Sequence, residues 1–467
     1  MVARKTKTPA EPPLDEAEAG VGSTGRPRPD LPKPYGDWSW MQGMDGESSS
    51  ASEGAVWRTR RFRHTIAGFG AMLLFLGMAG CEVLSGNFAG WRMLSDADAR
   101  LAEDVAMAVY VSPPDYAFTG AGYVLLIDQT GGVSAIQTAG MDVATLVWTE
   151  KGLFFSDVDR DYLLDAEGLK AWDSPKAEVQ VAAYPKPDGG GYVGVYNVGF
   201  GDVEAGDAGY IQQVVDTTEE RRSERYDVAG FTTLTAWCDG EIYGLSEIVE
   251  PYLSVAVDAG AKKREVPPFW PDMMSRLYPK PASLVDGFRS VSNNGVGGYA
   301  RNGICRDGTV MSVSIGQNDP TTVVTWPVDG DRSERVLVGP AGEALNLEPD
   351  TAFLGYVADW SASASELVWF GGDGVVRSTD IQTGRTQELW NADVDLHSSY
   401  NNIQFQNQVV YVFDAIAGQD SADRVMRLRA HDLVTGVTDE ILTVQPRFEL
   451  MARGSTVVQR GIAVRPG

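Results

Sequence analysis

Histidine is the scarcest chemically useful residue of this chain, with only three in 467 residues. His64 stands in a basic leader, which leaves His397 and His431 for the rest of the chain. A Ser-His-Asp site needs one of these as its base, and no G-x-S-x-G elbow supplies a nucleophile. A zinc site needs more histidine or cysteine than remains. We therefore assign no catalytic residue, and His397 is the better of the two histidines for such a role.

Long apolar runs are almost absent as well. The one run of membrane-spanning character extends from Thr65 to Cys81, after a basic flank of Arg58, Arg60, Arg61 and Arg63. Such a flank keeps the N-terminal side in the cytoplasm and directs the following chain across the membrane. Since no second run follows, we expect the folded part to lie on the extracytoplasmic side of the cell membrane.

Two anchors fit this segment, residues 64–84. Met78-Ala79-Gly80-Cys81 resembles the bacterial lipobox, whose cysteine is lipidated and becomes the mature N-terminus, although Met78 stands where leucine is usual. The alternative is an uncleaved span from Ile66 to Leu84, which is short and glycine-rich for a membrane helix. A cleaved signal peptide that leaves a soluble product ranks below both.

Residues 1–63 are rich in proline and serine, and their opposite charges nearly balance. Such a composition cannot bury enough apolar surface to offset chain entropy, so we predict that this segment is disordered. This segment has ten basic and nine acidic residues, so the remainder of the chain, with 29 basic and 55 acidic residues, carries a net charge of −26. An excess of carboxylates repels phosphate backbones, which argues against nucleic acid as a partner.

A change of pattern follows the anchor. The stretch SDADARLAEDVAMAV, which begins at Ser95, predicts a linker helix within residues 85–104, and residues 105–467 then show β patterns throughout. Runs rich in Val, Ile, Tyr, Phe and Trp, such as YVLLI at 123–127 and VVYVF at 409–413, alternate with Gly, Asp, Asn and Pro. The fold class is therefore all-β.

A weak repeat runs through this β region: strand, Asp-Gly turn, strand, D-x-x-T-G turn, strand. Residues 366–390 are the clearest copy, and Gly384 and Gly436 occupy equivalent turns of neighbouring copies. The spacing predicts a β-propeller of about seven four-stranded blades, with six or eight as alternatives. One blade assembled from both ends of the region, 123–136 and 455–464, would close the ring.

In the shape of these repeats, the chain resembles bacterial extracytoplasmic propellers with TolB-like or quinoprotein-like repeats. The resemblance covers roughly residues 105–465 and implies the fold alone, because no diagnostic motif accompanies it.

Three alternating carboxylates, Asp157, Asp159 and Asp161, form a candidate Ca²⁺ site in SDVDRDYLLD. They can converge on a cation if the chain bends sharply there. The EF-hand pattern fails beyond them, because Tyr162 stands at the glycine position and Gly168 at that of the bidentate glutamate. A solvated hairpin turn is the alternative, and the repeat itself predicts it.

Cys238 and Cys305 are the only possible cysteine pair in the exported part, where oxidising conditions permit a disulfide. Both precede a similar turn, so they would occupy matching places in different repeats. Matching places on stacked sheets lie about 10 Å apart, which is too far for a bridge unless the register shifts. A disulfide and two buried thiols both remain open.

One segment, EVPPFWPDMMSRLYPKP at 265–281, departs from the repeat. It reads as a short helix-compatible insertion bounded by prolines, with the candidate partner-binding residues Trp270, Met273, Met274 and Tyr278. Aromatic residues and methionine are enriched at binding surfaces. Packing of the insertion over the edge of the propeller is the alternative.

Together these features favour a membrane-anchored extracytoplasmic β-propeller that serves as a binding or interaction module. The expected partner is a cell-envelope protein or a glycan, and no cofactor is identified beyond the candidate Ca²⁺. The alternative is a propeller enzyme of hydrolase or lactonase type with a carboxylate–metal site at the central channel, which rests on fold analogy alone.

Overall fold

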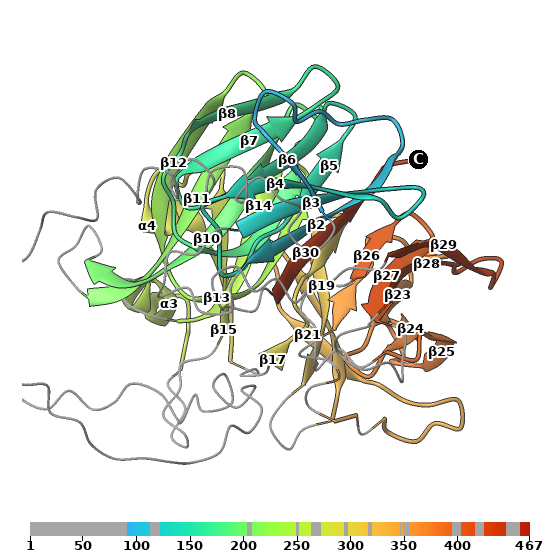
Figure 1. Cartoon of the computed structure of the whole chain (residues 1–467). Helices are drawn as coiled ribbons and strands as arrows, with labels where there is room; N and C mark the ends of the chain where they lie inside the picture. The colour runs from blue at the N-terminus through green and yellow to red at the C-terminus, as the bar shows by residue number, and fades with distance from the viewer. Residues whose placement is uncertain are drawn as a thin grey trace, which may run out of the picture. The chain divides into compact units, whose positions relative to one another are not determined.

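The computed structural model describes residues 91–112, 122–202, 208–248, 252–262, 272–293, 298–315, 320–345, 347–348, 351, 355–394, 403–415, 425–444 and 458–467. Within these ranges the strands form seven sheets, as expected for a seven-bladed β-propeller (Figure 1). We number the sheets blades 1 to 7 in chain order. His397, Trp270, Cys81 and the whole segment 1–90 lie outside the described residues.

The first four blades are built from consecutive strands, except that blade 1 also takes the last strand of the chain. Blade 1 contains β1 (Arg92–Leu94), β2 (Val105–Ser112), β3 (Gly122–Asp128), β4 (Val133–Thr138) and β30 (Val458–Val464). Blade 2 contains β5 (Val147–Thr149), β6 (Gly152–Ser156), β7 (Arg160–Leu164) and β8 (Leu169–Asp173). Blade 3 contains β9 (Val179–Pro185), β10 (Gly191–Asp202), β11 (Ala208–Thr218) and β12 (Arg222–Ala229). Blade 4 contains β13 (Thr232–Cys238), β14 (Glu241–Glu247), β15 (Asp272–Tyr278) and β16 (Phe288–Ser292).

The remaining blades follow the same antiparallel order. Blade 5 contains β17 (Gly298–Tyr299), β18 (Ile304–Arg306), β19 (Thr309–Ile315), β20 (Thr322–Pro327) and β21 (Ser333–Val336). Blade 6 contains β22 (Tyr356–Val357), β23 (Glu366–Phe370), β24 (Val375–Asp380) and β25 (Thr386–Asn391). Blade 7 contains β26 (Ile403–Gln406), β27 (Val409–Ala415), β28 (Met426–Asp432) and β29 (Thr438–Val444). Two short helices, α3 (Leu253–Asp258) and α4 (Leu284–Gly287), lie between strands of blade 4.

The ring closes between the two ends of the β region, as the sequence predicts. The C-terminal strand β30 pairs antiparallel with β2, and Figure 1 shows them side by side. Every junction between neighbouring blades buries an apolar cluster, including the one between blades 7 and 1, where Phe413 and Leu428 meet Val109 and Leu125. Innermost strands of neighbouring blades contact one another, as β5 does β9 and β13 does β18, and outer strands such as β21 and β29 are exposed.

The two faces of the ring differ in their connections. On one face, here called the turn face, the connections are mostly short turns. They join first to second strands, as at 239–240, 307–308 and 407–408, and third to fourth strands, as at 165–168, 381–385 and 433–437. The longest connections on this face are 279–287 and 358–365. On the other, the loop face, the connections include 113–121, 248–271, 337–355, 392–402, 416–425 and 445–457. Long connections therefore gather on one face.

The repeated D-x-x-T-G segments form equivalent turns on the turn face, between the third and fourth strands of blades 6 and 7. The Asp380 carboxylate accepts the backbone N–H groups of Gln382 and Thr383. In the equivalent turn, the carboxylate of Asp432 accepts the N–H groups of the residues two and three positions later. Each turn ends on a glycine with positive φ, 74° at Gly384 and 71° at Gly436. Glycine adopts this conformation without steric cost, which explains why it recurs at this position.

The linker helix expected after Leu94 does not form. Ser95–Ala99 makes a single turn, in which the N–H groups of Asp98 and Ala99 both donate to the Ser95 carbonyl, and strand β2 starts at Val105. Before the turn, β1 pairs parallel with β4 as an extra outer strand, and Trp91 is buried beside Tyr123. Pairing of β2 on both edges, with β3 and β30, outweighs the local helix propensity. No helix among the described residues is long and apolar enough to span a membrane.

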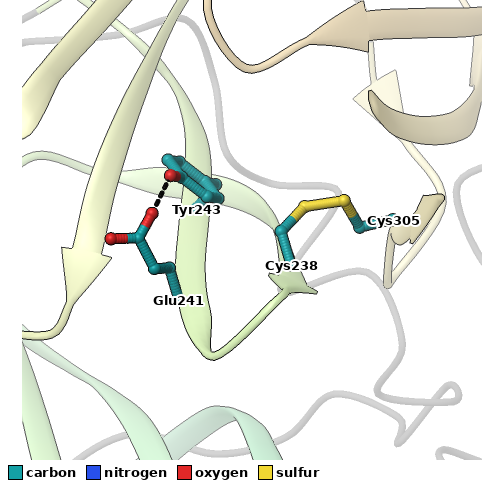
Figure 2. The surroundings of a disulfide bond; sticks show 4 residues. All are labelled: Cys238, Glu241, Tyr243 and Cys305. Carbon is teal, nitrogen blue, oxygen red and sulfur yellow. Dashed lines mark hydrogen bonds between the residues drawn. A yellow bond between two sulfur atoms is a disulfide. The ribbon is translucent and has the colours of Figure 1, made fainter. Parts of the chain in front are cut away.

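Cys238 and Cys305 are joined by a disulfide that links the innermost strands of blades 4 and 5 (Figure 2). Their Cα atoms lie 5.2 Å apart. Cys238 pairs with Glu241, the last pair before its turn, whereas Cys305 pairs with Val310, one position further from its own turn. The two cysteines are therefore one residue out of equivalent register, which is the shift that a bridge between repeats requires.

A break in blade 5 allows this approach. Its innermost strand is divided into β17 and β18, and between them Gly303 donates its N–H to the Thr235 carbonyl of blade 4 at 2.9 Å. A Cβ at Gly303 would lie 2.9 Å from a methyl carbon of Leu234, so a larger residue there would require the buried Leu234 side chain to shift. The sheet spacing of about 10 Å assumed from the sequence applies to facing sheets and not to inner strands that converge.

We predict that replacement of both cysteines by serine lowers the free energy of unfolding by roughly 2–4 kcal/mol, because the bridge restricts a long loop of the unfolded chain. Urea titration of the wild type and of the Cys238→Ser/Cys305→Ser variant measures the difference, with reductant added to the variant as the control. Alkylation of Cys238 and Cys305 in the unreduced, unfolded wild type would contradict the bridge.

Candidate functional site

A depression on the loop face lies where blades 1 and 2 meet. Its volume is about 730 Å³, and it is open to solvent on one side. The end of β4, the turn between β6 and β7 and the end of β8 surround it. Its lining is almost entirely polar and consists of Asp96, Gln137, Thr138, Ala139, Asp157, Asp159, Arg160, Tyr162, Asp173 and Pro175. We refer to it as the blade 1–2 pocket.

Asp157 is the structural centre of this pocket. One carboxylate oxygen accepts the N–H groups of Asp159 and Arg160, at 2.9 and 2.8 Å, and so fixes the turn between β6 and β7. The other accepts the Ala139 N–H of blade 1 at 2.9 Å and the Tyr162 hydroxyl at 2.7 Å. Burial raises the pKa of the Tyr162 phenol, and the neighbouring Asp157 carboxylate raises it further. Tyr162 therefore stays a neutral donor to Asp157.

Lys176 supports the same turn from below. Its ammonium group is inaccessible to solvent and donates to the carbonyl oxygens of Asp157, Arg160 and Ser174 at 3.3, 3.1 and 2.5 Å. Burial lowers the pKa of Lys176, and the carboxylate of Asp161, 3.1 Å away, acts in the opposite direction. The pair is thus a buried ion pair whose remaining hydrogen bonds are all satisfied within the protein, as such pairs require.

Asp161 faces away from the pocket, into the junction of blades 2 and 3. Besides Lys176, it accepts hydrogen bonds from Tyr192 at 2.8 Å, Thr217 at 3.1 Å and Ser223 at 2.5 Å. These three donors lie on strands of blade 3, so this carboxylate joins two blades. Sequence analysis did not identify Lys176 or Tyr192, since a single lysine after Pro175 and a tyrosine in a β run carry no motif.

The structure does not bring the three predicted calcium ligands together. Asp157 and Asp161 are buried in separate hydrogen-bond networks, and Asp159 is exposed. Asp157 belongs to the turn, whereas Asp161 is already in strand β7 and points to the opposite side. Among the described residues, no group of three His, Cys, Asp or Glu side chains is arranged to hold a metal ion. The carboxylates therefore act as acceptors for protein donors.

The predicted partner-binding insertion is also placed differently. Residues 272–278 form strand β15 in the middle of blade 4, where Met273 and Met274 are fully buried. Tyr278 is half-buried and donates to Asp216, with its ring stacked on Trp237. The apolar residues of this segment fill the blade, because β15 pairs with both β14 and β16. Met273 and Met274 are thus unavailable to a partner.

His431 has a structural role. Its Nδ1 lies 2.7 Å from the Thr438 hydroxyl, and its ring is stacked on Trp390 with centroids 4.3 Å apart. Burial lowers its pKa, so the ring is neutral at neutral pH. It lies in strand β28 of blade 7, and the residues that line the blade 1–2 pocket lie far from it in the sequence. The hydrogen bond of its ring among the described residues is the one with Thr438.

A second depression, of about 530 Å³, lies on the turn face of blades 1 and 2, around Trp148 and Arg465. The Arg465 guanidinium is 5.5 Å from the centre of the Trp148 ring and donates to the carbonyls of Ala102 and Val105 at 3.0 and 3.1 Å. Its charge is therefore engaged in holding the start of β2. This depression is a packing feature of the ring closure.

The blade 1–2 pocket has the chemistry of a binding surface. Its rim carries four carboxylates, those of Asp96, Asp157, Asp159 and Asp173, against the single guanidinium of Arg160, 3.8 Å from Asp173. Beside these charges, the lining contributes the polar side chains of Gln137, Thr138 and Tyr162. It can attract cationic groups and accept hydrogen bonds from hydroxyl or amide donors.

Comparison with known proteins supports the fold. A family model for the β-propeller domain of YycP matches residues 100–253, from the start of blade 1 into blade 4. This is less than half of the chain. No curated protein matches the chain.

Solved structures resemble the chain only distantly. AztD from Citrobacter koseri is 11% identical with a TM-score of 0.35, over 78% of this chain and 100% of its own. A puromycin-hydrolyzing peptidase of Mycobacterium tuberculosis is 12% identical with a TM-score of 0.42, over 76% of this chain and 56% of its own. The computationally designed Ika8 protein is 13% identical with a TM-score of 0.32, over 64% and 86%. At this level of similarity, none of them bears on function.

We predict that Asp157→Asn destabilises the propeller by about 1–3 kcal/mol, because an amide nitrogen faces backbone or hydroxyl donors on whichever side it lies. Asp159→Asn, two residues away and exposed, is the matched control and is expected to change stability by less than about 0.5 kcal/mol. Denaturant unfolding compares the two variants. Equal midpoints would show that the Asp157 hydrogen bonds do not hold the turn.

Proposed function

We propose that this chain is a membrane-anchored, extracytoplasmic β-propeller that binds a cell-envelope protein or glycan through its loop face. The observation that carries the proposal is the asymmetry of the ring. Connections such as 248–271, 337–355 and 445–457 join strand ends on the loop face, whereas the turn face is built mostly of tight turns. Loops on a rigid scaffold are where proteins place recognition.

The scaffold supports this role because the ring is closed and its junctions are packed. All seven junctions bury apolar clusters, so a change in one loop-face connection leaves the ring intact. The blade 1–2 pocket, on the same face, adds hydrogen-bond acceptors and one guanidinium that suit a polar ligand. The anchor in residues 64–84 would hold the domain at the cell membrane.

Binding is tested on the full chain in detergent, by thermal shift against purified envelope glycans and candidate envelope proteins. We expect at least one to raise the melting temperature, since a ligand of the folded state stabilises it by mass action. Arg160→Ala together with a shortened 416–425 connection should raise, at least tenfold, the ligand concentration needed to reach the same shift in melting temperature. A shortened 358–365 connection on the turn face is the control and should leave the shift unchanged.

Two outcomes would contradict this assignment. Loss of binding only in the variant with the shortened 358–365 connection would place the ligand on the turn face and not on the loop face. Turnover of a substrate by the purified chain, abolished by loop-face carboxylate substitutions, would favour the hydrolase or lactonase alternative.

Anchoring is tested separately by membrane fractionation of the chain expressed in a bacterium. We expect the wild type to remain with membranes after a high-salt wash and to enter the detergent phase. Cys81→Ser releases a lipoprotein but not a single-span protein, because only the former depends on acylation of that thiol. Recovery of the wild type in the soluble fraction would contradict either anchor.

A further inference from the structure

The chain enters the ring along the outer edge of blade 1. Strand β1 pairs parallel with β4, with Arg92 opposite Ser134 and Leu94 opposite Ile136. Strand β4 starts after the 129–132 turn on the turn face and runs toward the loop face, so β1 runs in the same direction. The residues that precede β1 therefore reach the ring at its turn face.

Residues 91–104, here called the strap, are fixed to the ring along this path. At its start, the side chain of Trp91 is buried. After β1, Asp96 lines the blade 1–2 pocket on the loop face. The strap then returns to the turn face, where the Leu101 N–H donates to the Asp165 carbonyl at 2.9 Å and the Leu101 side chain is buried between blades 1 and 2. The direction of entry is thus part of the folded structure.

The anchor expected at residues 64–84 lies close to this entry in the sequence. Only residues 85–90, here called the tether, separate it from Trp91. Seven Cα steps span at most about 25 Å, and a random coil of this length averages about 15 Å. A six-residue strand such as β4 rises about 20 Å. A tether that had to pass along this strand to reach a membrane at the loop face would be stretched almost to its limit.

The alternative anchor gives the same direction. The lipidated thiol would be that of Cys81, three residues before Leu84. These residues lengthen the average reach of the chain by only about 3 Å. A chain that leaves the ring at its turn face meets the bilayer there without being stretched, whichever anchor holds it.

The charges of the two faces agree with this direction. On the loop face, the rim of the blade 1–2 pocket carries four carboxylates against one guanidinium. On the turn face of the same blades, the charges that line the depression around Trp148 nearly balance: they are those of Glu150, Asp165, Glu167 and Glu219 against Lys151, Lys170 and Arg465. Anionic headgroups repel an excess of carboxylates, so the turn face is the better suited to lie against an anionic lipid surface.

We propose that the strap holds the ring with its turn face toward the membrane and its loop face directed away from it. The lipid surface is the partner of the turn face of blades 1 and 2, where β1 begins, and the blade 1–2 pocket opens on the opposite side. The inference rests on the anchor of the proposed function and adds the direction in which the loop face is presented. A ligand then reaches the loop face without entering the gap between the ring and the bilayer.

Gln129 and Gln137 provide a matched pair for the test. Both are exposed residues of blade 1, Gln129 in the turn before β4 on the turn face and Gln137 near the loop-face end of β4. A fluorescent amino acid replaces one of them at a time in the full chain. The protein is reconstituted into vesicles of phosphatidylethanolamine and phosphatidylglycerol with energy-transfer acceptors on the headgroups. We expect transfer to be several-fold more efficient from position 129, because the two positions differ in height by about 20 Å.

A longer tether tests whether the strap sets this direction. Insertion of about twenty Gly and Ser residues after Gly90 raises the average reach of the tether to roughly 30 Å, which lets either face approach the bilayer. Measurement in about 1 M salt removes the contribution of surface charge, since the Debye length is then about 3 Å. Under these conditions, the difference between the two positions should persist with the natural tether and disappear with the longer one.

The outcomes separate this inference from the anchor on which it rests. Equal transfer from the two positions, or greater transfer from position 137, in protein that floats with the vesicles leaves the anchor in place and overturns the inference. A difference that the insertion leaves unchanged overturns it as well. Protein that does not float with the vesicles refutes the anchor, and the inference with it.

Discussion

Closure of the ring by strand β30 is the constraint on which the rest of this structure depends. An open propeller would expose the edge of β2 to pairing with other chains, and β30 covers that edge. Arg460 secures the strand, with its guanidinium donating to the Ser112 hydroxyl at 2.9 Å and lying 3.2 Å from Asp142. Each blade buries its apolar faces only against its two neighbours, so no blade is stable outside the ring. Residues at opposite ends of the β region are thus energetically coupled.

The junctions of the ring are not alike. The junction of blades 5 and 6 has an apolar core with Val313 and Trp369, and its hydrogen bonds include those between the Asn302 amide and the Val357 backbone. The junction of blades 2 and 3 also contains the buried Asp161–Lys176 ion pair. A buried ion pair with its hydrogen bonds has one arrangement, which restricts shifts of one blade against the next. The polar junctions therefore fix the orientation of blade 2, and with it the turn at Asp157 that lines the loop face.

Much of the fold can be predicted from the sequence, because every blade of a propeller repeats the same order of strands and turns. A D-x-x-T-G turn needs an acceptor side chain and a residue that tolerates positive φ, and both requirements appear as identities at Asp380 and Gly384. The closure of the ring is also legible, since the first and last strands are each an incomplete unit. What failed were predictions from local propensity alone. The stretch after Ser95 has helical composition, yet its second half forms β2, because β2 pairs with β3 on one edge and with β30 on the other.

The site was less predictable, because it depends on which side of a strand each residue faces. Met273 and Met274 look like an exposed cluster in the sequence, but as the third strand of a blade they face its two buried sides. A bridge between Cys238 and Cys305 depends on the break in the first strand of blade 5, which the sequence marks only by Gly303. Register between blades is not encoded by spacing within one blade, so contacts across a junction are the last to be inferred.

The three carboxylates of SDVDRDY show why a ligand-like pattern does not make a site. Alternate residues share a side only where the chain stays extended, and here Asp157 ends one strand at a turn while Asp161 lies in the next. Lys176 then lies between their networks, bound to the Asp157 carbonyl and the Asp161 carboxylate. A cation that drew these carboxylates together would have to displace this ammonium group and leave it buried without its partner. Asp159 differs from the other two, because it is exposed while Asp157 and Asp161 are buried. It is therefore the carboxylate of the three that a ligand on the loop face can reach.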